Sequence, residues 1–187
     1  MIKTSPLSVK TIEKIAKEVR ESFNIKLDEA FPILDYLNHL FYKGELGIQI
    51  IDDDDLYLDK KTVALYNASD NFIYLKESVI EEVDNGIYRS NFTLAHELFH
   101  YIQAQIFKFD FYEVETRKAY EDPEWQANEF AGELLLPKAF LVDDDIDFLA
   151  SHFKVSKECV LTRKVKKKRR EEKNSNNDWV KEDSKRF

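Results

Sequence analysis

The chain has 187 residues, of which 43% are hydrophobic and 13% aromatic, with four glycines and four prolines, so we expect one folded domain rather than a linker-rich or low-complexity protein. Its net charge of −8 does not favour nucleic acid as the main partner. The single cysteine, Cys159, excludes an internal disulfide framework, and with no apolar signal core at the N-terminus and no run of eighteen apolar residues we expect a cytoplasmic protein that does not enter a membrane.

The first 45 residues predict two amphipathic helices. Apolar residues recur at three- and four-residue spacing from Ser8 to about Phe23 and again from Leu27 to about Tyr42, as in a helix with one buried face. Pro32 falls near the start of the second helix, where its missing N–H does little harm. We expect His39, on this second helix, to be a surface or half-buried histidine rather than a ligand.

Three short strands follow. Residues 47–51, 62–66 and 72–75 are rich in β-branched and aromatic residues. The polar residues 67–71 predict a turn that joins the last two strands into a hairpin, and hence a small antiparallel sheet. Residues 77–83 predict a short helix or an irregular loop.

The stretch from Ser90 to Tyr101 predicts a largely buried helix. Either Ser90 or Asn91 would cap its start. Apolar residues then repeat at helical spacing along one face. They are Phe92, Ala95, Phe99 and Ile102.

This helix carries a possible metal site, His96-Glu97-x-x-His100. Residues four apart lie one helical turn above each other, so both imidazoles can reach one ion. Zinc accepts neutral imidazole nitrogens, and Glu97 beside His96 suits a general base acting on water at the metal. The alternative is two unrelated histidines on an amphipathic helix. We favour the metal because a buried Glu and two buried histidines are costly without a partner.

A third zinc ligand must come from another element, because a catalytic zinc takes three protein ligands and one water. Asp122-Pro123 predicts the start of a helix that runs to Leu136 and stops before Pro137. Glu124 shares one face of this helix with small residues that allow close approach of a second helix, so it can reach the ion. Glu129 and Glu133 point about 100–180° away from that face, and we expect them to be exposed to solvent.

The C-terminal part predicts a short helix through Ala150 and another that starts near Lys157. His152 lies between them without a nearby ligand partner. Seven of the eight residues 163–170 are basic, and residues 166–187 predict a frayed helix end or a flexible tail. The alternative for this basic run is a weak contact with nucleic acid or an acidic partner. We therefore divide the chain into one domain, 1–165 (N-terminal helices 1–45, catalytic core 46–140, C-terminal helices 141–165), and a tail, 166–187.

Two motifs together carry a resemblance to a known family. The first motif is Phe92-Thr93-Leu94-Ala95-His96-Glu97-Leu98-Phe99-His100, and the second is Glu124-x-x-Ala127-Asn128-x-Phe130-Ala131-x-Glu133-Leu134-Leu135-x-Pro137. The later residues 149–156 are similar to the C-terminal segment of the same family. The chain resembles the ImmA/IrrE family of zincin-like metallopeptidases over about residues 45–165.

The resemblance implies an α+β fold with a small antiparallel sheet packed on helices. It implies His96, His100 and Glu124 as zinc ligands and Glu97 as the catalytic base. Members of the family often act in bacteria or mobile elements on helix-turn-helix repressors, so it also implies such a regulator as the substrate. The family often has glycine at the position of Phe99, where a larger side chain would narrow the cleft.

The zincin analogy further suggests that the substrate adds as a strand to an exposed edge at Phe72–Leu75. Tyr101 and Tyr120 are candidates to stabilise the oxyanion. The aromatic connection around Phe107, Phe109 and Phe111 is expected to pack over the site. A non-proteolytic module that sequesters a regulator, or acts in a toxin–antitoxin pair, is the alternative function.

Overall fold

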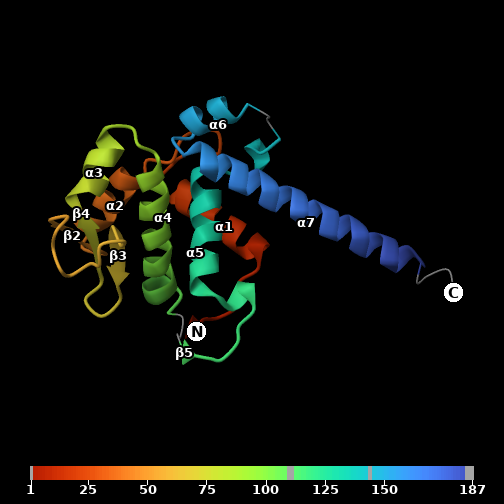
Figure 1. Ribbon diagram of the computed structural model, residues 1–187, viewed down its shortest axis with the longest axis horizontal. Helices are drawn as coiled ribbons and strands as arrows, with labels where there is room; N and C mark the ends of the chain where they lie inside the picture. The colour runs from red at the N-terminus through yellow and green to blue at the C-terminus, as the bar shows by residue number, and fades with distance from the viewer. Residues whose placement is uncertain (1, 109–111, 143–144, 184–187) are drawn as a thin grey trace.

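Helices cover one side of a small three-stranded sheet, and the fold is α+β as expected from the sequence (Figure 1). The computed structural model describes residues 2–108, 112–142 and 145–183. The elements are β1 (Ile2–Lys3), α1 (Val9–Ser22), α2 (Ile33–Tyr42), β2 (Gly47–Ile51), β3 (Ala64–Asn67), β4 (Phe72–Lys76), α3 (Glu77–Asp84), α4 (Arg89–Tyr101), β5 (Tyr112–Glu113), α5 (Pro123–Leu135), α6 (Ile146–His152) and α7 (Lys157–Asp183). No helix among the described residues is both long enough and apolar enough to cross a bilayer.

The two N-terminal helices form, but the second starts later than predicted. Ser8 caps α1 by accepting a hydrogen bond from the Thr11 N–H, and the apolar side of α1 is buried. In contrast, α2 begins only at Ile33, directly after Pro32. The prediction of a helix from Leu27 is therefore wrong. Proline disfavours the helical conformation in the residue before it, so the helix begins after Pro32 rather than running through it.

The sheet has the strand order β2–β4–β3, so β4 is the central strand. The β3–β4 hairpin is antiparallel as predicted, whereas β2 pairs with β4 in parallel, with Gly47 opposite Phe72. The sheet is therefore mixed rather than wholly antiparallel. Because β4 has partners on both sides, a substrate cannot add as a strand at Phe72–Leu75, and that prediction is wrong.

Helices α4 and α5 lie side by side in the centre of the molecule and pack on each other more extensively than any other pair of elements (Figure 1). Their close approach is possible because Ala95, Ala127 and Ala131 are fully buried. Phe99 stacks on Phe130 with ring centroids 4.6 Å apart and is also fully buried. It fills the core, so the expectation that it narrows the cleft is wrong.

The α4 helix starts at Arg89, one residue before the first expected cap. Ser90 and Asn91 both lie inside its first turn. Their side chains bind other elements: Ser90 donates to Glu82, and Asn91 donates to the Lys154 carbonyl across 2.9 Å. These two residues fix the position of α4 rather than capping it.

The last helix, α7, extends well beyond the body of the molecule (Figure 1) and reaches Asp183. It continues past residue 166, where the sequence predicts a frayed helix end or a flexible tail. The division of the chain into a domain up to residue 165 and a tail stays a prediction. Phe109, Phe111 and residues 184–187 lie outside the described residues, and so does much of the expected aromatic connection over the site.

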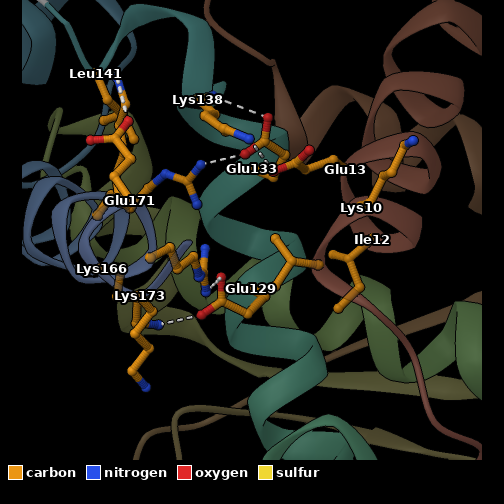
Figure 2. A pocket seen from close by; sticks show the side chains of 14 residues that line it. Lys10, Ile12, Glu13, Glu129, Glu133, Lys138, Leu141, Lys166, Glu171 and Lys173 are labelled. Carbon is orange, nitrogen blue, oxygen red and sulfur yellow. Dashed lines mark hydrogen bonds and ion pairs between the residues drawn. The ribbon is translucent and has the colours of Figure 1, made fainter. Parts of the chain in front are cut away.

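Buried and half-buried cations attach α7 to α5. Glu129 accepts from Lys166 and Arg170, both at 2.8 Å, and Glu133 pairs with Arg163. These ion pairs line a cavity of about 550 Å³ that residues of α1 also line, and Figure 2 shows Glu129 and Glu133 among its lining side chains. Glu129 is only 3% exposed, so the prediction that both acids are exposed to solvent is wrong. Part of the basic run thus serves packing within the chain.

Candidate metal centre

Three side chains from two helices converge at one point. His96 and His100 lie one turn apart on α4, and Glu124 comes from the first turn of α5. The Nε2 atoms of the histidines are 3.0 Å apart. The carboxylate oxygens of Glu124 lie 3.1 Å from Nε2 of His96 and 3.2 Å from Nε2 of His100. The structure therefore brings together the three residues that the sequence indicated as ligands.

The start of α5 is held in a way that directs Glu124 at α4. Asp122 caps the helix by accepting a hydrogen bond from the Glu124 N–H at 3.0 Å. The same carboxylate pairs with Arg117, which also donates to the Ile2 carbonyl in β1. The cap and Pro123 at the first helical position were both predicted from the sequence.

The donor set fits a zinc ion. Two imidazole nitrogens and one carboxylate oxygen are common zinc ligands, and three protein ligands leave a fourth position for water, as in catalytic sites. Ligand atoms on a tetrahedral zinc are about 3.3 Å from one another, close to the separations of 3.0–3.2 Å seen here. The residues present could therefore hold the ion with little rearrangement.

The electrostatics of Glu124 and His100 also favour a bound cation. Hydrogen bonds from His100 and His96 hold the pKa of the Glu124 carboxyl well below its ordinary value. Burial lowers the pKa of His100. The hydrogen bond to Glu124 and the charges of Glu97 and Glu124 raise it by more, so the net pKa is above its ordinary value. The site thus attracts positive charge, either as a proton or as a metal ion.

Glu97 lies on the same helix but points to the sheet. Its Oε2 accepts a hydrogen bond from the backbone N–H of Tyr66 on β3 at 2.8 Å, and the residue is only 7% exposed. Burial raises the pKa of Glu97, and the neighbouring His100, the Tyr66 N–H and His96 offset part of that rise. A carboxylate with a raised pKa is a better match for accepting a proton near neutral pH.

The other candidate residues lie elsewhere. His39 packs against the ring of Phe23, and Nε2 of His152 lies 2.6 Å from the Asp28 carbonyl oxygen. Tyr101 is buried beside Tyr66. Tyr120 lines an apolar hollow with Leu7, Val9 and Trp125. The role of either tyrosine in stabilising the oxyanion stays a prediction.

Sequence reasoning missed two buried amides next to the histidines. Gln103 follows His100 by three residues, in a π-helical turn, Ile102–Ile106, that continues α4. Gln126 follows Glu124 by two residues, and both side chains are fully buried. Their spacing from the ligands was a usable signal, since metal-bound histidines commonly use their second nitrogen to donate a hydrogen bond.

Comparisons with known proteins find one matching family and a similar solved structure. The peptidase M78 family model, described as the IrrE N-terminal-like domain, matches residues 44–164. A solved Mycobacterium tuberculosis transcriptional regulator has a TM-score of 0.55 and 18% identity, covering 80% of this chain and 44% of that protein. The chain therefore spans less than half of the regulator's length, and the likeness shows the fold alone. A comparison with curated proteins finds no match.

The family match extends over well over half of the chain and includes both α4 and α5, the two helices that carry His96, His100 and Glu124. The suspected resemblance is thereby confirmed, and the chain belongs to the IrrE N-terminal-like domain family of peptidase M78.

Proposed function

We propose that this chain is a zinc-dependent endopeptidase and that its substrate is a helix-turn-helix transcriptional regulator. The observation that carries the proposal is the convergence of His96, His100 and Glu124 within hydrogen-bonding distance, beside the buried carboxylate of Glu97. In this proposal the first three residues bind zinc and Glu97 is the general base.

Each residue then has a distinct role. A bound zinc ion would polarise the peptide carbonyl and lower the pKa of a water molecule. Glu97 takes a proton from that water as the water oxygen attacks the carbonyl carbon. Glu97 then gives the proton to the departing amine nitrogen, so the C–N bond breaks and the carboxylate is regenerated. The Tyr66 N–H occupies Oε2 of Glu97 and leaves Oε1 to exchange the proton.

A hollow next to the site supports a peptide substrate. Its volume is about 420 Å³, and its walls include Thr93 on α4 and Asn128 on α5. These two residues lie one helical turn from His96 and Glu124, on the same faces of their helices. A peptide whose scissile carbonyl lies at the metal would place a neighbouring side chain in this hollow.

The family assignment supports a regulator as the substrate, because members of the ImmA/IrrE family often act on helix-turn-helix repressors. The test is to incubate the purified chain with zinc and a helix-turn-helix regulator encoded beside its gene. A discrete fragment that is absent with the Glu97→Gln variant supports the peptidase. A stable complex without a fragment supports the alternative, a binding module that sequesters its partner.

A further inference from the structure

A chain of hydrogen bonds through two buried amides connects His100 to the backbone. Nδ1 of His100 lies 3.1 Å from Oε1 of Gln103, and Nε2 of Gln103 donates to Oε1 of Gln126 across 2.7 Å. Nε2 of Gln126 donates to two carbonyl oxygens, those of Ser5 and Tyr120, each at 2.8 Å. Both glutamine side chains are fully buried.

The direction of every hydrogen bond in this series follows from the two backbone carbonyls at which the series ends. A carbonyl oxygen only accepts, so the atom of Gln126 that faces both carbonyls must be the NH₂ group. Its oxygen then faces Gln103, which must present its own NH₂ group in return. Gln103 is left with its oxygen toward His100, so Nδ1 of His100 must carry a proton.

That proton decides which nitrogen of His100 can bind a metal. A neutral imidazole has one N–H, and the other nitrogen has the lone pair. With the proton on Nδ1, a neutral His100 ring has its lone pair on Nε2, the atom that faces His96 and Glu124, whereas a protonated ring donates from Nε2 to Glu124. Metal-bound histidines usually donate their other N–H to a carboxylate, a backbone carbonyl or water. Here a side-chain amide takes that place.

We propose that Gln103 and Gln126 are positioning residues that fix the tautomer and the ring orientation of His100 for metal binding. The inference rests on the proposed zinc site. Turning either amide over would place oxygen against oxygen or NH₂ against NH₂ in a buried site. The orientation of both amides is therefore fixed by the carbonyls of Ser5 and Tyr120, which are not themselves at the proposed metal site.

This fixed arrangement includes the N-terminal segment. Ser5 is one of the two residues whose carbonyls accept from Gln126. The backbone on both sides of Ser5 is held as well: the Thr4 N–H donates to the Glu121 carbonyl at 2.9 Å, and the Leu7 N–H donates to the Tyr120 carbonyl at 3.0 Å. Gln126 is two residues from the third ligand, Glu124. The same contacts thus hold the start of α5 and orient the histidine on α4.

The test uses the full-length chain and two readouts. The first is ¹H–¹⁵N NMR of the His100 ring in the metal-free protein, where we expect a proton on Nδ1. In Gln103→Leu the ring loses this acceptor, and Nε2 faces the Glu124 carboxylate at 3.2 Å, so the proton should move to Nε2. The second readout is the zinc dissociation constant, which should rise about 10–100-fold in Gln103→Leu.

Two further variants separate positioning from simple packing. Gln103→Glu keeps an oxygen for Nδ1–H but loses the NH₂ group, so it should cost stability while retaining the tautomer and most of the zinc affinity. Gln126→Leu frees Gln103 to turn over and should weaken zinc binding even if Gln103→Leu does not fold. The control is Gln105→Leu, on the same π-helical turn but bound to the Tyr66 hydroxyl, which should leave the affinity unchanged.

The proposal is overturned if metal-free wild-type protein has an unprotonated Nδ1 on His100. It is also overturned if zinc affinity follows the loss of stability across the variants, with Gln103→Glu as weak as Gln103→Leu. If the wild-type protein binds no zinc, the proposed function fails, whereas the NMR result on the metal-free protein still decides the role of the two glutamines.

Discussion

The carboxylate of Glu97 on α4 accepts a hydrogen bond from the backbone N–H of Tyr66 on β3 across 2.8 Å. Tyr66 is on the strand at the edge of the sheet, and its N–H points away from β4 toward the helix. Buried backbone N–H groups need a partner, and here a side chain of the proposed active site provides it. The sheet therefore positions the base, whereas α5 supplies the third metal ligand.

Glu97→Gln should abolish most of the cleavage without removing zinc. Glutamine has the same shape, and its oxygen can still accept from the Tyr66 N–H, but it cannot take a proton from water. General bases contribute about 10²–10⁴-fold, so we expect kcat/KM for regulator cleavage to fall by about that factor. Zinc content by elemental analysis should stay stoichiometric. The exposed Glu115→Gln is the control, and retained cleavage with full zinc occupancy would refute the role of Glu97.

Zinc should stabilise the protein against heat only when Glu124 is present. A ligand at a hundred times its dissociation constant adds about 2.7 kcal/mol to the free energy of unfolding, which corresponds to roughly 5–10 °C in Tm for a chain of this size. We expect this shift by differential scanning fluorimetry in the wild-type protein and in Glu115→Ala. In Glu124→Ala it should disappear at the same zinc concentration. An equal shift in Glu124→Ala would remove that residue from the ligand set.

The parts of the site that were predictable are those encoded locally. The His96–His100 spacing, the Asp122 cap and Pro123 are separated by only a few residues within their own elements, and helical geometry converts that spacing into direction. The small residues of α5 then predicted which face meets α4. These three local rules were enough to bring Glu124 to the histidines.

The features that were missed depend on partners far apart in the chain. Glu129 and Glu133 look like solvent-exposed acids from α5 alone, because the cations that pair with them on α7 lie at least 30 residues later. The parallel pairing of β2 with β4 was likewise invisible, since no short turn joins those strands. The Tyr66 N–H that holds Glu97 gives no sequence signal at all, because every residue except proline has a backbone N–H.

Glu129→Gln should destabilise the protein at neutral pH and much less in acid. Burial raises the pKa of Glu129, but the hydrogen bonds and charges of Lys166 and Arg170 lower it more, so the net pKa is depressed. A carboxyl group with a depressed pKa stabilises the fold at pH values above its ordinary pKa of 4.5. This contribution is lost as the pH falls through the pKa of the folded state. Because both cations are partly exposed, we expect about 1–2 kcal/mol at pH 7, less than for a fully buried pair.

Urea unfolding of the wild type and Glu129→Gln at several pH values between 7 and 3 measures this difference. The exposed Glu172→Gln on α7 is the control and should show no such trend. A gap between wild type and Glu129→Gln that stays constant down to the lowest pH would mean that the ion pairs with α7 do not stabilise the charged form of Glu129.

Gly132→Ala tests how closely α7 packs on α5. A Cβ at this position would lie 2.5 Å from a guanidinium nitrogen of Arg163 and 3.1 Å from its Cδ. Arg163 is buried and paired with Glu133, so it cannot move aside freely. Overpacking typically costs about 1–3 kcal/mol, and alanine in a helix regains roughly 1 kcal/mol over glycine. We therefore expect a net loss of unfolding free energy in Gly132→Ala.

The sign of this effect should reverse when Arg163 is removed. In an Arg163→Ala background the space next to residue 132 is open, so Gly132→Ala should stabilise that variant by up to about 1 kcal/mol through helix propensity alone. Chemical denaturation of the four proteins in this double-mutant cycle gives the coupling between the two positions. Equal effects of Gly132→Ala in both backgrounds would show that Arg163 does not press against α5 and that the glycine is there for another reason.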